Sequence, residues 1–440
     1  MKKVLIGALA LSAANLLLAG DLSIIGEVKE RFETLDGMNK KAYGNVGALA
    51  EKSDDNLLVS RLQLGMIYKQ SPDVTWKAQA YYSSVSGWSF GNDDFKKTSG
   101  SDTYWLNPQA DFDLVDLNLE VKNLAGVSGL STKIGRQSNR YGDKRILGPG
   151  SWGNSYGWLW DLAKASYKFD DNFIDAFYGQ TKDKDPNQFS LFSKHVYEGA
   201  GVYSHFKTNK KGAIEPFLIY KNGLYTEAGT GENTEKSYTY GFRAYDKDLF
   251  NFNYDLTYAK ADGTIKTKDY DAYAYVAKVG YQLKDVTWKP NLVIGQVFAS
   301  GDSDTTDNTV KTFRTPFGGT DGSLYGRMDI MSWSNLVENL VELHVDPTAQ
   351  THLKLSYHDF SLAEANDQWT YYKKSNTGGN AFTELGQEID AELKYKYSKE
   401  LEFQAIYAYF KAGDFVTQNV SDNNAHRLFL QVHYKFNYGL

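Results

Sequence analysis

The sequence predicts an all-β protein: a transmembrane antiparallel β-barrel of about eighteen strands, of the outer-membrane type. Three observations support this fold class. The chain begins with an export signal. Its polar and apolar residues alternate with a period of two in segment after segment, and the gaps between these segments are alternately short and long.

The first twenty residues have the parts of a secretory signal peptide. Lys2 and Lys3 precede an apolar stretch from Val4 to Leu18, and two small residues follow it. The alternative is an N-terminal anchor helix, but the apolar run is short for a membrane span and no stop-transfer charges follow it. We expect a cleaved signal peptide at 1–20 and a single barrel domain with long extracellular loops at 21–440.

Composition and charge exclude several classes of protein. The mean hydropathy of −0.50 excludes a bundle of membrane-spanning helices, which needs repeated apolar runs of about 20 residues. The net charge is −6, and it becomes −8 without residues 1–20, which carry two lysines and no acid. This acidic balance predicts no nucleic-acid partner. Because the chain has no Cys, it has no disulfide framework and no thiolate chemistry.

The alternation of polar and apolar residues is clearest in the last segment. One face carries Leu428, Leu430, Val432, Tyr434, Phe436, Tyr438 and Leu440, and the other carries Arg427, Gln431, His433, Lys435 and Asn437, with Phe429 as the exception. A soluble sandwich also alternates, but its strands average about 5–6 residues. Many segments here run for about 10–14 residues, near the ~9–11 that a tilted strand needs to cross a bilayer.

The order of the connections decides between these two classes. The expected strands are 21–33, 57–70, 74–84, 111–122, 130–137, 159–169, 172–180, 196–207, 212–221, 236–246, 250–260, 270–284, 288–299, 336–346, 350–360, 385–398, 400–411 and 425–438. Short turns alternate with long loops, notably 34–56, 85–110, 138–158, 300–335 and 361–384. This is the periplasmic and extracellular asymmetry of outer-membrane barrels, and a sandwich has no reason to keep it.

The membrane imposes closure and a route of assembly. A sheet in lipid must close, because an open edge leaves backbone groups unpaired. The aromatic-rich final strand resembles the signal that outer-membrane assembly machinery recognises. With no plug-sized N-terminal region before the first strand, we expect the loops to supply any constriction of the lumen.

The lumen is expected to carry charged side chains that set selectivity. Four arginines fall on the inward register, Arg31, Arg61, Arg243 and Arg427, while others fall in or beside loops 138–158 and 300–335, namely Arg136, Arg140, Arg145, Arg314 and Arg327. A guanidinium binds carboxylates through a planar fork, so these residues suggest a path for an anionic solute. The alternative is that they pair with inward acids and stiffen the wall; those acids are Glu27, Asp116, Glu120, Asp255, Glu342 and Asp390.

The side-chain direction of Arg136 is ambiguous. It shares parity with Ile134, which would aim it at lipid, and a charge near mid-bilayer costs about 2–4 kcal/mol. We therefore expect a bulge at Gly135 or a position beyond the membrane rim.

Three stretches of the sequence resemble the alginate export family of outer-membrane porins. The first is Gly135-Arg136-Gln137 with Tyr141-Gly142-Asp143, Arg145, Gly148-Pro149, Trp152 and Asp161; the second is Ser300-Gly301-Asp302 with Phe313, Tyr325-Gly326, Asp329 and Trp333-Ser334-Asn335-Leu336; the third is Tyr357-His358-Asp359-Phe360 with Gly386, Ile389-Asp390, Tyr397 and Phe410. The resemblance implies an eighteen-stranded barrel whose lumen passes solutes. It adds Asp143, Trp152 and Asp161 to the expected substrate path.

Other constellations carry less weight. Asp302, Asp304 and Asp307 could collect Ca²⁺, but they lack the EF-hand spacing, and a solvated acidic loop is favoured. Ser356 and His358 share a strand face while Asp359 points away, so no local catalytic triad forms and no enzyme is predicted. The aromatic side chains near residues 141–160 could stack sugar rings or anchor the barrel at the membrane interface; these are Tyr141, Trp152, Tyr156, Trp158 and Trp160.

The sequence thus predicts an outer-membrane porin of a Gram-negative bacterium that passes small hydrophilic solutes, anionic or saccharide solutes among them. No cofactor and no metal site are predicted. The partners are outer-membrane lipid, the solute and the barrel-assembly machinery. The alternatives are a dedicated exporter of an acidic polysaccharide such as alginate, and a barrel enzyme or adhesin.

Overall fold

The computed structural model describes residues 20–38, 43, 55–87, 96–99, 102–105, 110–148, 158–182, 195–223, 235–318 and 324–439. The expected signal peptide at 1–20 lies outside these residues except for Gly20, and the first strand begins at Asp21. Among the described residues, no helix is long and apolar enough to span a membrane.

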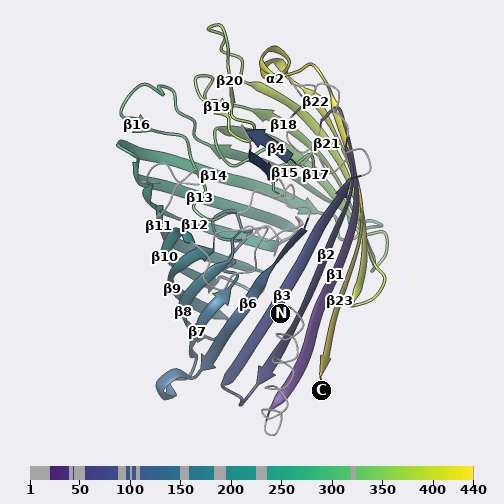
Figure 1. Ribbon diagram of the computed structural model, residues 1–440. Coiled ribbons are helices and arrows are strands. Elements are labelled where there is room, and N and C mark those ends of the chain that lie inside the picture. Colours follow the sequence, from purple (N-terminus) through teal and green to yellow (C-terminus); the bar gives the residue numbers. More distant parts are fainter. Residues whose placement is uncertain are drawn as a thin grey trace.

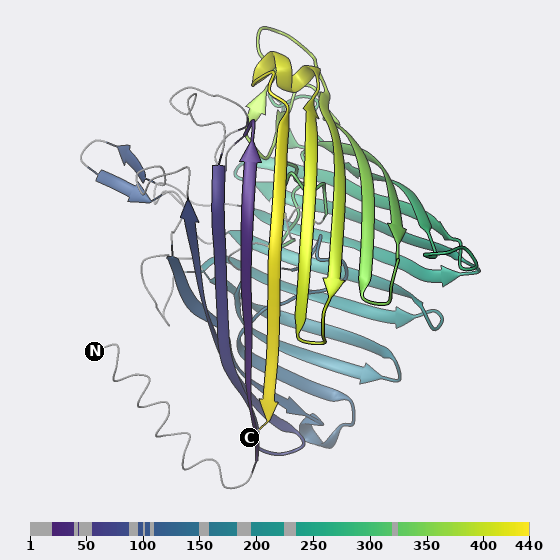
Figure 2. The same ribbon diagram turned by 90° about the vertical axis from the view of Figure 1, so that its right-hand side faces the viewer.

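The chain forms a closed antiparallel barrel of eighteen strands, which confirms the predicted fold class (Figures 1 and 2). Consecutive barrel strands are neighbours, and the first pairs with the last, from Ser23 with Gly439 to Asp36 with His426. The barrel strands are β1 (Asp21–Asp36), β2 (Asp55–Lys69), β3 (Val74–Gly87), β6 (Ala110–Lys122), β7 (Leu130–Gln137), β8 (Trp160–Phe169), β9 (Asn172–Lys182), β10 (His195–Lys207), β11 (Gly212–Gly223), β12 (Lys236–Leu249), β13 (Phe252–Ile265), β14 (Lys268–Gln282), β15 (Asn291–Ala299), β17 (Leu336–Val345), β18 (Thr351–Ser361), β21 (Glu384–Lys396), β22 (Leu401–Ala412) and β23 (Ala425–Gly439).

Small elements decorate the connections. The long connections carry β4 (Lys96–Ser99), β5 (Asp102–Trp105), β16 (Thr309–Val310), β19 (Gln368–Trp369), β20 (Lys374–Ser375) and the helix α2 (Asp414–Asn419), and a short turn carries η3 (Leu124–Gly126). Figure 2 shows α2 at one end of the barrel and the C-terminus at the other, where the short turns lie. We call these the long-loop end and the short-turn end.

Some strand boundaries differ from the expected ones. Strand β15 begins at Asn291 rather than 288, because Trp288 and Lys289 adopt positive φ angles of 67° and 45°, which end the extended conformation. Strand β13 runs to Ile265 rather than 260 and β14 begins at Lys268 rather than 270, so only Lys266 and Thr267 lie between them.

The two faces of the strands differ as the alternation predicted. In β23, Leu430, Val432 and Tyr438 are exposed on the outer face, whereas Arg427 and Gln431 are buried inside. Phe429, the exception to the alternation, is fully buried on the inner face, with the guanidinium of Arg427 4.3 Å from its ring centre. An apolar outer face and a mixed inner face suit a wall that separates lipid from a lumen.

Two long loops, 138–158 and 300–335, contact each other inside the barrel, in line with the expectation that loops constrict the lumen. Leu147 of loop 138–158 forms a parallel bridge with Phe317 of loop 300–335. The Gly148 amide donates to the Phe317 carbonyl at 2.9 Å, and the Phe317 amide donates to the Ile146 carbonyl at 3.2 Å. The inward loop 300–335 is anchored by buried apolar side chains, which are Phe313, Phe317, Tyr325, Met328, Ile330, Met331 and Trp333. Burial of this apolar surface stabilises the loops inside the barrel.

Candidate functional site

A polar recess of about 430 Å³ lies in the barrel interior, nearer the short-turn end. Strands β1, β2, β3, β6, β8 and β23 line it together with residues from the start of loop 138–158. Its polar lining is Glu27, Gln63, Lys77, Gln79, Asp116, Ser138, Arg140, Lys164 and Lys435. Charged and amide side chains around an open space provide hydrogen-bonding partners for a hydrophilic solute.

Basic side chains outnumber acidic ones in this recess. Its two carboxylates are already ion-paired: Glu27 with Arg61 at 2.5 Å and His433 at 3.1 Å, and Asp116 with Lys77 at 2.7 Å. Lys164 lies 3.6 Å from Asp175, and Arg140 and Lys435 also line the recess. Among the lining side chains four are basic and two are acidic, although the whole chain is acidic.

Arg136 is buried and forms a two-pronged ion pair with Asp161 across the β7–β8 ladder. Its Nη2 donates to Asp161 Oδ2 at 2.7 Å, its Nε donates to Oδ1, and Asp113 lies 3.7 Å from Nη1. The pairing of β7 with its neighbours keeps its register here, so the expected bulge is not a register shift. The irregularity lies in the backbone of Gly135, whose φ of +119° suits glycine.

Arg243 is held by carboxylates of two neighbouring strands. Its Nη2 donates to Asp255 Oδ2 at 2.7 Å and its Nε to Oδ1 at 2.8 Å, while Nη1 lies 3.4 Å from Glu215 Oε2. Glu215 also accepts a hydrogen bond from Tyr203 at 2.8 Å and lies 2.8 Å from His205. Arg243 is thus ion-paired with inward acids, which is the arrangement expected if the arginines stiffen the wall.

Arg31 and Arg427 share one carboxylate. Glu33, fully buried, lies 2.7 Å from Arg31 and 3.1 Å from Arg427, and Asp329 of the inward loop is 3.9 Å from Arg427. These arginines therefore connect β1 and β23 at the closing seam with the inward loop.

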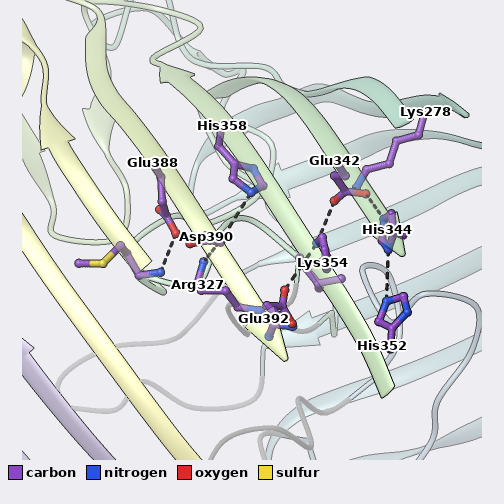
Figure 3. A network of polar contacts seen from close by, with 12 residues as sticks. Lys278, Arg327, Glu342, His344, His352, Lys354, His358, Glu388, Asp390 and Glu392 are labelled. Carbon is purple, nitrogen blue, oxygen red and sulfur yellow. Dashed lines mark hydrogen bonds and ion pairs between the residues drawn. The ribbon is translucent and has the colours of Figure 1, made fainter. Parts of the chain in front are cut away.

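A polar network follows β14, β17, β18 and β21 on the inner face (Figure 3). Glu342 lies 3.4 Å from Lys278, 3.0 Å from Lys354 and 3.3 Å from His344. The Lys354 ammonium is also 3.7 Å from Glu392, which is ion-paired with Arg327 of the inward loop. Arg327, expected in the substrate path, thus binds the barrel wall.

A second part of the network is centred on His358 of β18. The His358 ring is 2.7 Å from Glu338 on β17 and 3.4 Å from Asp390 on β21. Its ring stacks on Phe360, and all three polar residues are buried. His358 thereby ties three strands of the wall together.

Arg145 connects the two inward loops. Its Nε donates to Asp143 at 2.8 Å, its Nη2 donates to the Leu324 carbonyl at 3.2 Å, and its guanidinium lies over the rings of Tyr325 at 4.6 Å and Trp333 at 5.9 Å. Arg145 and Asp143, both expected in the substrate path, therefore lie in the packing between the loops.

The described aromatic side chains near residues 141–160 pack against other rings inside the barrel. Trp158 and Trp160 pack edge-on against Phe317 at 5.5 and 4.5 Å, and Tyr141 stacks on Tyr203 at 4.4 Å. These rings hold the loops against the inner wall, away from the lipid interface. Trp152 and Tyr156 lie outside the described residues.

The aspartates of loop 300–335 cap turns of their own loop. Asp304 accepts hydrogen bonds from the hydroxyl and the amide of Thr306, which lower its pKa. The amide of Thr309 and the ammonium of Lys311 likewise lower the pKa of Asp307. No group of three or more His, Asp or Glu side chains in the described part of the chain is placed to hold a metal ion.

Several residues that matter here were not singled out from the sequence. Lys77, Lys164, Lys435, Gln63 and Gln79 line the recess, and their inward parity was the available signal. Glu338 and Glu388 contact His358 and the inward loop, respectively, and no local sequence pattern distinguishes them from other inward acids.

Comparisons with known proteins agree with this fold. The family model described as "Alginate export" matches residues 48–431. OccAB1 of Acinetobacter baumannii has a TM-score of 0.62 at 11% identity, covering 94% of this chain and 97% of that one. For Pseudomonas aeruginosa OccK8 (OprE) the values are 0.59 and 13%, covering 95% and 98%; for Pseudomonas aeruginosa OpdK with vanillate they are 0.57 and 11%, covering 95% and 99%. A comparison with curated proteins finds no match.

Proposed function

Because this chain belongs to the alginate export family of outer-membrane barrels, we propose that it is a passive channel through which small hydrophilic solutes cross the outer membrane. The observation that carries the proposal is the polar recess inside a closed barrel, where Lys77, Lys164, Arg140 and Lys435 exceed the acids in number. An excess of positive charge favours anionic solutes, including carboxylated sugars.

The proposal includes the route by which the barrel reaches its membrane. The signal peptide at 1–20 directs export from a Gram-negative cytoplasm, and β23 presents its aromatic outer face to the assembly machinery. No enzymatic activity is part of the proposal. Its support is the prediction from the sequence together with the position of β23 at the closing seam.

Conductance in a planar lipid bilayer tests the channel directly. The purified, refolded barrel is expected to give discrete conductance steps, with a reversal potential in a KCl gradient that indicates a preference for anions. A folded protein that inserts and never conducts would refute the proposal, and hydrolysis or surface binding without conductance would favour a barrel enzyme or adhesin.

Neutralising the recess tests where the preference arises. The Arg140→Gln and Lys435→Gln variants are expected to lower the anion-to-cation permeability ratio by about twofold each, because both cations line the recess. Lys210→Gln is the matched control, since Lys210 lies in an exposed short turn. An unchanged ratio in both recess variants would place the selectivity elsewhere.

Export of an acidic polysaccharide is supported less well. A polyanion requires cations that can turn to it, yet Arg31, Arg61, Arg136, Arg145, Arg243, Arg327 and Arg427 are each ion-paired with a carboxylate of this chain. Strong anion preference that weakens in Arg136→Ala or Arg145→Ala would favour the exporter, and cation selectivity would argue against it.

A further inference from the structure

The inward loop 300–335 contacts two distant parts of the barrel wall. Phe317 packs on Trp160 of β8 at 4.5 Å and lies 5.7 Å from the Lys221 ammonium of β11. Arg327 and Met328 contact β21 and β23. Between β8 and β21 there are nine barrel strands in one direction round the ring and seven in the other, so the two contacts lie on nearly opposite walls.

The contact with β21 is made through the backbone of the loop. The amide of Met328 donates to Glu388 Oε1 at 2.7 Å, and the amide of Arg327 donates to Asp390 Oδ2 at 3.1 Å. Both carboxylates are buried on the inner face of β21, two residues apart. Figure 3 shows Glu388, Asp390 and Glu392 in a row along this strand, with Arg327 beside them. Two backbone amides of the loop thus donate hydrogen bonds to carboxylates of the barrel wall.

Side chains outside β21 bind carbonyl groups of the same segment of the loop. Arg427 of β23 donates from Nη1 to the Met328 carbonyl at 2.6 Å and lies 3.5 Å from the Arg327 carbonyl. The Trp369 indole donates to the Ile330 carbonyl at 3.1 Å. A loop inside a barrel has no strand ladder to satisfy its backbone, so these side chains replace one.

Gly326 allows this close approach. Its φ is +84°, and a Cβ there would lie 2.6 Å from Glu388 Oε2, closer than side-chain atoms pack. Tyr325 on one side of this glycine stacks under Arg145, and Met328 on the other is fully buried. Gly326 therefore allows the tip of loop 300–335, which we define as residues 325–328, to approach the carboxylates of β21 closely.

We propose that Glu388 and Asp390 are positioning residues that hold the tip of loop 300–335 against β21, and that the docked tip sets the size limit of the pore. The inference rests on the proposed channel function for its effect on solutes, but the docking of the tip does not depend on it. Residues Tyr325-Gly326 and Ile389-Asp390, which carry the family resemblance, then serve to fix the tip rather than to touch solute.

Cysteine labelling tests the docking without any measurement of transport. The chain has no Cys, so Met328→Cys gives a single thiol at a fully buried position. Adding Glu388→Ala or Gly326→Ala is expected to raise the rate of maleimide labelling about tenfold in the folded, detergent-solubilised barrel, because the tip then opens locally. Phe250→Cys, in an exposed turn, reports the rate of an accessible thiol in each background.

Two matched controls separate docking from general disturbance. Asp116→Ala removes a buried inward carboxylate of β6 that pairs with Lys77 of the wall, and Gly378→Ala alters a glycine of φ +64° with open space around it. Both are expected to leave the labelling of the thiol at position 328 unchanged. Gly326→Ala alters no barrel residue, so it decides the question if Glu388→Ala fails to fold.

Bilayer recordings then test the consequence for the pore. The Glu388→Ala and Gly326→Ala variants are expected to show about twofold higher conductance and to admit larger neutral polymers than the parent. Unchanged labelling in both variants would overturn the docking, and faster labelling with unchanged conductance would overturn the docked tip as the size limit. A parent protein that never conducts, with labelling that still responds, would refute the channel and leave the docking in place.

Discussion

At the scale of single residues, parity along a strand predicted most side-chain directions but not that of Arg136. The alternation placed Arg31, Arg61, Arg243 and Arg427 inward, and the structure buries all of them except Arg243, which is partly buried. Arg136 departs from parity because the unusual backbone of Gly135 precedes it and because Asp161 and Asp113 compensate its charge. Parity cannot anticipate either feature, since both depend on neighbouring strands.

The Arg136–Asp161 pair allows a stability prediction. Asp161→Ala leaves the buried guanidinium with Asp113 3.7 Å away, and Asp161 itself is 33% exposed, so the barrel is expected to lose about 2–3 kcal/mol, less than most fully buried pairs cost when one partner is removed. Urea titration of the refolded barrel, followed by tryptophan fluorescence, measures the loss. The double variant Arg136→Ala with Asp161→Ala is expected to recover part of it. A single variant as stable as the parent would show that the pair contributes nothing.

At the scale of elements, the strands were predictable and the loops were not. A strand with a lipid face and a lumen face must alternate, so the eighteen strands could be located to within a few residues. The path of loop 300–335 depends on contacts with strands far away in sequence, such as those of Met328 with Glu388 and Arg427. The cluster of family-like residues indicated that the loop matters but not which strands its described residues contact.

The closing seam between β1 and β23 allows a prediction about assembly. Gly26 faces Phe436 across the seam, and a Cβ at Gly26 would lie 2.1 Å from the ring, so the aromatic side chain covers the glycine. Gly26→Val is expected to overpack the seam at a cost of about 1–3 kcal/mol and to lower the folded fraction. Heat-modifiable gel mobility measures that fraction. Gly439→Val, at the same seam with open space around it, is the control, and equal folding of both variants would contradict the prediction.

At the scale of the whole molecule, the sequence was sufficient for the barrel and insufficient for the lumen. Closure follows from the need to pair every strand edge in lipid, and the pairing of β1 with β23 meets it. The charge of the lumen could not be predicted in the same way, because the inward register of an arginine does not show which carboxylate it pairs with. Among the described residues, basic side chains outnumber acidic ones in the lining of the recess that contains Arg140 and Lys435, whereas Arg243 and Arg427 are ion-paired with carboxylates of the wall.

This distribution of charge predicts how selectivity responds to salt. If the anion preference arises from the field of a few lumenal cations rather than from direct binding to unpaired arginines, salt must weaken it. The Debye length falls from about 10 Å at 0.1 M to about 3 Å at 1 M. We therefore expect a modest anion preference at low KCl that approaches the ratio of bulk mobilities at high KCl, measured as the reversal potential at a fixed gradient. A strong preference that persists at high salt would indicate a chain of direct contacts, and would move the interpretation back to a polyanion exporter.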